Sequence, residues 1–203
     1  MHWLAGTVSR VGDSIAEAEK KVSSEANPET YPSWATITYE FPARGDQPPV
    51  KLVWYEGSEN GKRNLPNLTF PGGQEPTDSG CMLIGDKGRL YSPGDSGDVQ
   101  QLEVKGQVKT PERTIERLGS EVGPDENQKR EWILAIEGGS AALSNFDYAS
   151  VLTEAMLLGN VAVRVGKAIE YDGQEGTITN HLDAASLVAP ASRKGWELEN
   201  LSR

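Results

Sequence analysis

The sequence is poor in the residues that form most covalent and metal centres. Its 203 residues include one cysteine and two histidines. A single cysteine excludes an internal disulfide, and two histidines provide few ligands for a metal site. We expect Cys81, which lies in the apolar run Gly-Cys-Met-Leu-Ile, to be a buried and inert thiol. We interpret His181 and Asp183 as a solvated helix start rather than as a pair of metal ligands.

The glycine spacing of a dinucleotide-binding loop is also missing. None of the 22 glycines is followed two residues later by another, so the Gly-x-Gly-x-x-Gly fingerprint is absent. The segment from Gly57 to Arg63 has some likeness to a phosphate loop, but it is one residue short and ends in arginine. Gly85-Asp-Lys-Gly88 is predicted to be a hairpin turn. We therefore expect no cofactor site and no metal site in this chain.

Long apolar runs and a positive net charge are absent as well. No stretch of 18 apolar residues occurs, and the first residues do not have the pattern of a signal peptide. The net charge of −10 argues against nucleic acid and anionic membranes as partners, because both attract clustered Lys and Arg. Uncharged ligands such as sugars remain possible. The compartment is not fixed by the sequence: cytoplasm is the default, and export would require a signal upstream.

The clearest secondary-structure patterns are those of β-strands. Ala35, Ile37, Tyr39 and Phe41 alternate with polar residues, which is typical of a half-buried strand. Further strands are predicted at Val50–Tyr55, Cys81–Ile84, Arg89–Tyr91, Leu102–Val104, Ile169–Tyr171 and Thr177–Thr179. The residues from Glu56 to Ser79 show no periodicity and are predicted to be a long polar connection.

Helical patterns dominate the second half. Asp125 can cap a helix from Glu126 to Glu137, with Gln128 completing the capping box and Gly138-Gly139 ending it. Trp132, Ile133 and Ile136 form its predicted buried stripe. Near the N-terminus, Trp3–Ala5 is interpreted as the end of a helix, whereas Ile15–Lys21 fits a helix or an edge strand.

A longer helix is predicted from Asn145, preceded by the capping pattern of Ser144 and Asp147. Its apolar face comprises Tyr148, Val151, Leu152, Ala155, Leu158 and Ala162. Leu157 and Val161 lie on the other side, which indicates a second neighbour for this helix. Strands followed by helices predict an α+β fold, in which helices cover one face of a mainly antiparallel sheet.

Five residues are candidates for a ligand site. Tyr31 and Trp34 flank the start of the first clear strand, beside a proline-rich loop. Asn145, Asp147 and Tyr148 lie at the opening of the long helix, where unpaired N–H groups and the helix dipole favour polar ligands. Capping and core packing are the alternative role of both groups.

Several segments, taken in order, resemble a known enzyme family. These segments are Tyr31–Pro42, Lys51–Tyr55, Leu83–Gly88, Arg130–Trp132, Ser144–Tyr148, Leu152–Ala155, Leu158–Asn160 and Arg193–Trp196. Together they are similar to the C-terminal half of the glucose–fructose oxidoreductase / inositol dehydrogenase (Gfo/Idh/MocA) family. The resemblance implies an open, mainly antiparallel sheet with helices on one face, as in dihydrodipicolinate-reductase-like C-terminal domains. It covers the chain from about Tyr31 to the end.

In that family, an N-terminal domain binds NAD or NADP, and the C-terminal domain holds a sugar or polyol and mediates oligomer contacts. This chain lacks the glycine fingerprint and the Glu-Lys-Pro segment, and the Asp/His pair would precede Trp3. We therefore assign it no catalytic residue and expect a truncated relative. Residues 1–30 are expected to hold a helix stub and the first strand, and residues 31–203 the substrate-binding and oligomerisation domain.

The resemblance implies the substrate-binding and oligomerisation part of an NAD(P)-dependent sugar or polyol oxidoreductase, inactive by itself and a homo-oligomer through its sheet. The alternative is a free-standing, non-catalytic module that self-associates or binds carbohydrate through Tyr31 and Trp34. The sequence fixes neither the substrate nor the choice between NAD and NADP.

Overall fold

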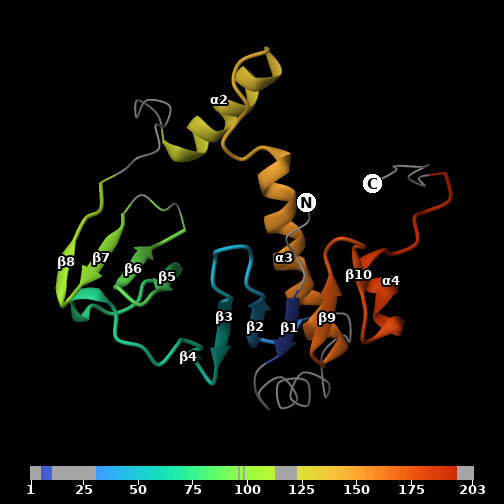
Figure 1. The fold of residues 1–203 in the computed structure, drawn as a ribbon, viewed down its shortest axis with the longest axis horizontal. Coiled ribbons are helices and arrows are strands. Elements are labelled where there is room, and N and C mark those ends of the chain that lie inside the picture. The colour runs from blue at the N-terminus through green and yellow to red at the C-terminus, as the bar shows by residue number, and fades with distance from the viewer. Residues whose placement is uncertain (1–5, 11–30, 96, 98, 113–122, 196–203) are drawn as a thin grey trace. The chain divides into compact units, whose positions relative to one another are not determined.

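The protein has an α+β fold with 28% helix and 29% strand. The computed structural model describes residues 6–10, 31–95, 97, 99–112 and 123–195. Contacts divide the chain into two compact units, one comprising Met1–Pro66 with Phe146–Arg203 and the other Asn67–Asn145. Each unit contains an antiparallel sheet of its own (Figure 1). The predicted fold class, α+β with mainly antiparallel sheets, is thus confirmed.

The first unit contains a six-stranded sheet in the order β10-β9-β1-β2-β3-β4. Its strands are β1 (Gly6–Arg10), β2 (Trp34–Phe41), β3 (Val50–Glu59), β4 (Lys62–Arg63), β9 (Ile169–Asp172) and β10 (Thr177–Ile178). The strands predicted near residues 35, 50, 169 and 177 are therefore present. Strand β1 inserts between β9 and β2, so the chain's two ends contribute to the middle of one sheet.

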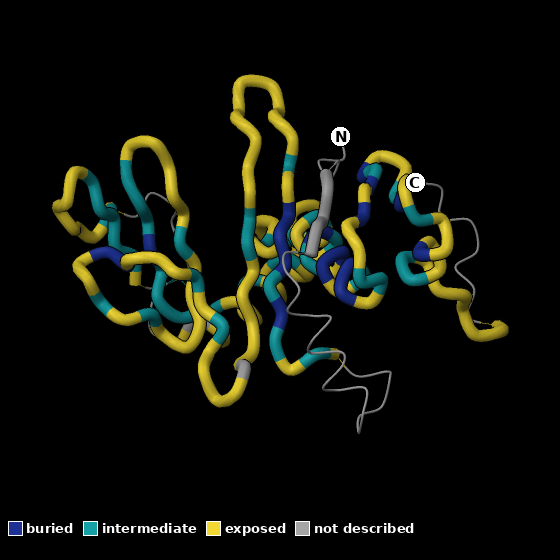
Figure 2. The backbone as a smooth tube through the Cα atoms, turned by 90° about the horizontal axis from the view of Figure 1, so that it is seen from below, coloured by how far each residue is buried: buried dark blue, intermediate teal, exposed yellow. Residues whose placement is uncertain are grey.

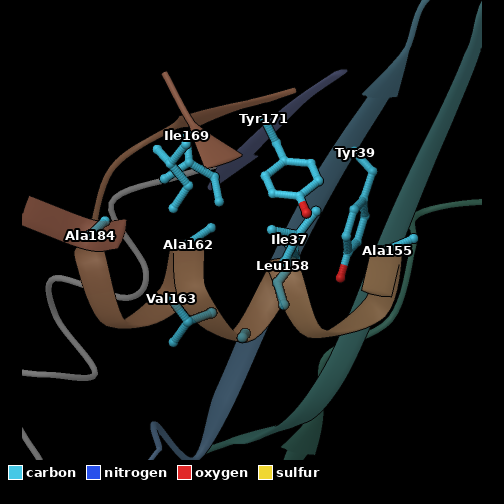
Figure 3. Close-up of a cluster of buried hydrophobic side chains, with 11 residues drawn as sticks. Ile37, Tyr39, Ala155, Leu158, Ala162, Val163, Ile169, Tyr171 and Ala184 are labelled. Carbon is cyan, nitrogen blue, oxygen red and sulfur yellow. The ribbon is translucent and has the colours of Figure 1, made fainter. Parts of the chain in front are cut away.

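The long helix α3 (Phe146–Val165) covers one face of this sheet and packs on β1 and β2. Figure 3 shows the buried side chains between helix and sheet. The core comprises Ala35, Ile37, Tyr39, Ala155, Leu158, Ala162, Val163, Ile169, Tyr171, Ile178 and Ala184. Ala184 comes from η2 (Leu182–Ala184), which leads into the short helix α4 (Ala185–Val188). His181 immediately precedes η2 and Leu182 is exposed, which agrees with the predicted solvated helix start.

Only part of the apolar face predicted for α3 is buried. Ala155, Leu158 and Ala162 are buried, as predicted, but Tyr148 and Leu152 are exposed. The reason is positional, because the buried core meets the helix from Ala155 onwards and only Val151 of the preceding apolar positions packs against it. Periodicity identifies the side of a helix that is apolar, but it does not tell how far along the helix the sheet extends.

The second unit contains a four-stranded sheet in the order β5-β6-β7-β8. The strands are β5 (Gly80–Ile84), β6 (Arg89–Pro93), β7 (Gln101–Val104) and β8 (Gln107–Lys109). The predicted hairpin around Gly85-Asp-Lys-Gly88 is confirmed, with the Gly85 N–H donating to the Gly88 carbonyl at 3.0 Å. A small core forms where Tyr91 meets Phe70 edge-on, with 4.9 Å between the ring centroids.

Two predictions about this part of the chain were wrong. Cys81 is exposed rather than buried, because the sheet face that it shares with the exposed Leu83 is not covered by the described residues. The segment from Glu56 to Ser79 is not one irregular connection. Strand β3 continues to Glu59, turns at Asn60-Gly61 into β4, and the 3-10 turn η1 (Pro71–Gly73) follows.

The helix predicted before α3 exists, but its buried stripe does not. Helix α2 (Pro124–Ile136) has its C-cap at Glu137 and is followed by Gly138-Gly139, the predicted stop, and Gly123 rather than Asp125 takes the N-cap position. Trp132 is 62% exposed and Ile136 69% exposed, and Ile133 is exposed as well. The stripe is exposed because nothing in the described residues covers it. Trp3–Ala5 and Ile15–Lys21 lie outside the described residues.

Candidate functional site

Tyr31 and Trp34 lie where the chain enters β2. Tyr31 is exposed just before the strand, and Trp34 is half-buried opposite Gly57 of β3. The two backbones come unusually close here. A Cβ on Gly57 would lie 2.0 Å from the Ser33 carbonyl oxygen, and the Ser58 N–H donates to that oxygen at 3.3 Å. Gly57 thereby fixes the backbone beside Trp34.

Asn64, which no sequence motif singles out, holds this end of the sheet together. Its side-chain amide donates to the Ala35 carbonyl at 2.8 Å and to the Thr36 hydroxyl at 3.0 Å. Trp54 adds an exposed aromatic ring, and its indole N–H donates to Glu56 at 3.1 Å. Tryptophan within a strand already indicates sheet packing, so composition alone did not mark Trp54 as a surface residue.

The residues around the start of α3 have mixed roles. The Asn145 amide donates to the Ala142 carbonyl at 3.0 Å, so it stabilises the turn that leads into the helix. Asp147 lies in the first helical turn, where its carboxylate favourably faces the positive end of the helix dipole. Asp147 and Tyr148 are both exposed. Asn145 therefore has a structural role in the preceding turn, and the exposed Tyr148 is accessible to a ligand.

The two groups of candidates lie at different places on the first unit. Strand alternation places Trp34, like Thr36 and Thr38, on the sheet face away from α3. Tyr148 lies on α3 itself, which covers the other face. Asn145 belongs to the second unit and is not placed relative to Tyr31 or Trp34.

Two tyrosines close the core rather than line an open site. Burial, assisted by the nearby negative charge of Glu56, raises the pKa of Tyr39 to about 12. Its hydroxyl therefore stays protonated at neutral pH and donates to the helix backbone. Tyr171 is also buried, and its hydroxyl donates to the carboxylate of Glu154. Figure 3 shows both rings between sheet and helix.

The opposite face of the first sheet has a mixed chemical character. Strand alternation places Thr36, Thr38, Val53 and Tyr55 on the face away from α3. Thr36 and Val53 are half-buried and Tyr55 is exposed. Thr38 is buried, yet its hydroxyl oxygen has no hydrogen-bond partner in the described part of the chain. Buried hydroxyl groups normally have a partner, so Thr38 is an exception among the described residues, and its burial shows that this part of the face is covered.

The described residues hold no cluster of three or more His, Cys, Asp or Glu side chains suited to a metal ion. Within the same ranges, no helix is long and apolar enough to cross a membrane. Comparison with known proteins finds no matching family model, no matching curated protein and no matching solved structure. The functional argument therefore rests on the residues and their geometry.

Proposed function

We propose that this chain forms the substrate-binding and oligomerisation part of an NAD(P)-dependent sugar or polyol oxidoreductase. The observation that carries the proposal is the uneven covering of the six-stranded antiparallel sheet by the described residues. Helix α3 packs on one face, and the face bearing Thr36 and Tyr55 is partly exposed. A domain with this layout can present one sheet face to a second protein surface while its rim holds a small ligand.

The character of that face supports assembly. Val53 and Tyr55 provide apolar area, whereas the half-buried Thr36 provides a hydroxyl group, which accepts from Asn64 at 3.0 Å and can also donate. Interfaces between subunits combine apolar and hydrogen-bonding groups in this way, with aromatic residues enriched and charged residues depleted at their centre. We propose the finer fold assignment, a dihydrodipicolinate-reductase-like C-terminal domain, on the same layout.

Substrate binding is assigned to the aromatic residues at the rim. Tyr31 is exposed and Trp34 is half-buried where the chain enters β2, and flat aromatic faces of this kind stack on the apolar side of sugar rings. Asp147 and Tyr148, at the start of α3, form a separate candidate contact site. A neutral polyol suits this chain, since a net charge of −10 disfavours anionic ligands.

The cofactor part of the proposal is tested by titration with NADH and NADPH, followed by nucleotide fluorescence. The chain has no Gly-x-Gly spacing, so we expect no micromolar binding to it alone. Micromolar binding would show that the cofactor site lies within these residues.

The substrate part is tested by NMR with a panel of sugars and polyols. We expect shifts at Trp34 that are lost in Trp34→Ala, and an unperturbed spectrum across the panel would refute that part.

The alternative function is a free-standing module that self-associates or binds carbohydrate without any cofactor partner. It shares the exposed sheet face and the aromatic rim with the first proposal. Size-exclusion chromatography with light scattering separates the two. A stable dimer that shows no response when a nucleotide-binding domain of the family is added in trans favours the module. An aggregating chain that becomes soluble and active with that domain favours the oxidoreductase part.

A further inference from the structure

The outer edge of strand β5 carries the backbone groups needed to pair with another strand. Strand β5 stands at the end of the second sheet and pairs with β6 alone (Figure 1). The Gly94 N–H donates to the Ser79 carbonyl at 2.8 Å and the Gly85 N–H to the Gly88 carbonyl at 3.0 Å. Hydrogen-bonded pairs alternate along an antiparallel ladder, so Cys81 and Leu83 also face β6. The N–H and C=O groups of Gly80, Met82 and Ile84 therefore point outward.

This edge lacks the features that normally prevent strand pairing. Exposed edges are usually protected by charged residues or proline, and β5 has neither in its sequence Gly-Cys-Met-Leu-Ile. By contrast, edge strand β8 ends in Lys109, and edge strand β4 consists of Lys62 and Arg63. The side chains of β5 are apolar and accessible, since Leu83 is 62% exposed and Ile84 60% exposed.

We propose that β5 pairs antiparallel with β5 of a second copy of this chain, about a two-fold axis at Met82. In this register Met82 faces Met82 of the other copy, and Gly80 faces Ile84, so all three outward residues pair within the strand. A shift by two residues would leave one of them opposite a residue outside β5. The net charge of −10 repels a second copy, and an uncharged strand is a place where that repulsion is small.

The contact is small, which sets its strength. Stable protein interfaces bury about 800 Å² on each partner, and two five-residue strands bury less. The dimer should therefore be weak and depend on concentration. The proposal is independent of the oxidoreductase assignment, because it uses the second sheet and needs no substrate or cofactor.

Sedimentation velocity over a range of protein concentrations measures the association. Met82→Pro removes the central outward N–H but no ladder hydrogen bond to β6, and proline is tolerated at such edge positions. Because two hydrogen bonds are lost per dimer, we expect the dissociation constant to rise about tenfold or more. Ile84→Lys should weaken the dimer similarly, whereas Val99→Lys, the same kind of change in an exposed loop of this unit, should not. Circular dichroism verifies that each variant is folded.

Disulfide crosslinking tests the register, because Cys81 is the only cysteine. A Met82-centred pair places Cys81 opposite Leu83 of the other copy, at a Cα separation of about 4.5 Å, which a disulfide can span. We expect copper–phenanthroline to link wild-type chain to the Cys81→Ser/Leu83→Cys variant in a mixture, and neither protein to itself. Self-linking of either protein would refute this register. Equal variant and control affinities, or no link in the mixture, would refute the pairing altogether, whatever the nucleotide and sugar titrations show.

Discussion

Gly159 allows α3 to lie close to the first sheet. A Cβ at this position would be 2.0 Å from the Tyr39 hydroxyl oxygen and 2.9 Å from its ring. Gly159→Ala should therefore lower the free energy of unfolding by about 1–3 kcal/mol, the usual cost of overpacking. Tyr39→Phe added to Gly159→Ala should recover part of the loss, since it removes the nearer atom. Denaturant unfolding measures both.

Gly85→Ala is the matched control for Gly159→Ala. A Cβ on Gly85 would approach the Gly88 carbonyl oxygen no closer than 3.9 Å, which is ordinary contact. The same substitution should therefore change stability by less than about 0.5 kcal/mol in this turn. If Gly159→Ala were equally mild, α3 would not pack on Tyr39 as closely as described.

Tyr39 also makes stability depend on pH in the alkaline range. Its pKa rises from 10.0 to about 12 on folding, mainly because the hydroxyl is buried. The unfolded chain then loses this proton first, so the contribution is complete below pH 10 and is lost as the pH approaches 12. We expect the free energy of unfolding to fall more steeply over this window in wild type than in Tyr39→Phe. Parallel pH profiles for the two proteins would contradict the buried, neutral hydroxyl.

At the scale of elements, sequence patterns located strands better than they located burial. The alternation of Ala35, Ile37 and Tyr39 predicted β2 and its buried face correctly, because a strand's two faces are fixed by its period. The same reasoning failed for Trp132 and Ile136 in α2. An apolar stripe shows that a helix favours a neighbour, but burial depends on whether another element packs against the stripe.

The hairpin of β3 and β4 was missed although the sequence contained its signal. Asn60 and Gly61 both have positive φ, at 51° and 75°, and connect Glu59 to Lys62. Asn-Gly is typical of the two-residue turn that this backbone requires. The polar composition of residues 56–79 hid the turn, because no apolar alternation follows it. The position of Trp34 opposite Gly57 was not predicted either, because composition does not encode which residues of two strands pair.

Two glycines of this hairpin separate backbone strain from steric contact. Gly57 and Gly61 both have φ of +75°, but only Gly57 would bring a Cβ within 4 Å of other atoms. Gly61→Ala should cost about 1 kcal/mol for the left-handed backbone alone. Gly57→Ala should cost at least twice as much, since the added Cβ meets the Ser33 carbonyl. Thermal unfolding of both variants measures the difference, and equal losses would show that the chain does not approach Gly57 at Ser33.

For the molecule as a whole, buried residues are concentrated where helix and sheet meet, and many large apolar side chains are exposed to solvent. Figure 2 shows the long exposed connection between β2 and β3 and the buried segments around α3. Exposed apolar residues occur on α2, β5 and the first half of α3. Isolated exposed apolar residues are common, but several on each of three elements are typical of proteins that associate.

Two leucines on α3 test this division between core and contact surface. Leu158 is 5% exposed and Leu152 is 48% exposed, although both belong to the apolar face that the sequence predicts. Leu158→Ala should lower the free energy of unfolding by about 2–5 kcal/mol, because it leaves a cavity under the sheet. Leu152→Ala should cost less than about 1 kcal/mol in the isolated chain.

If the first half of α3 contacts a partner in the assembled protein, Leu152→Ala will weaken that association without unfolding the chain. Denaturant unfolding and light scattering on the same samples measure the two effects, and a large loss of stability in Leu152→Ala would place this residue in the core.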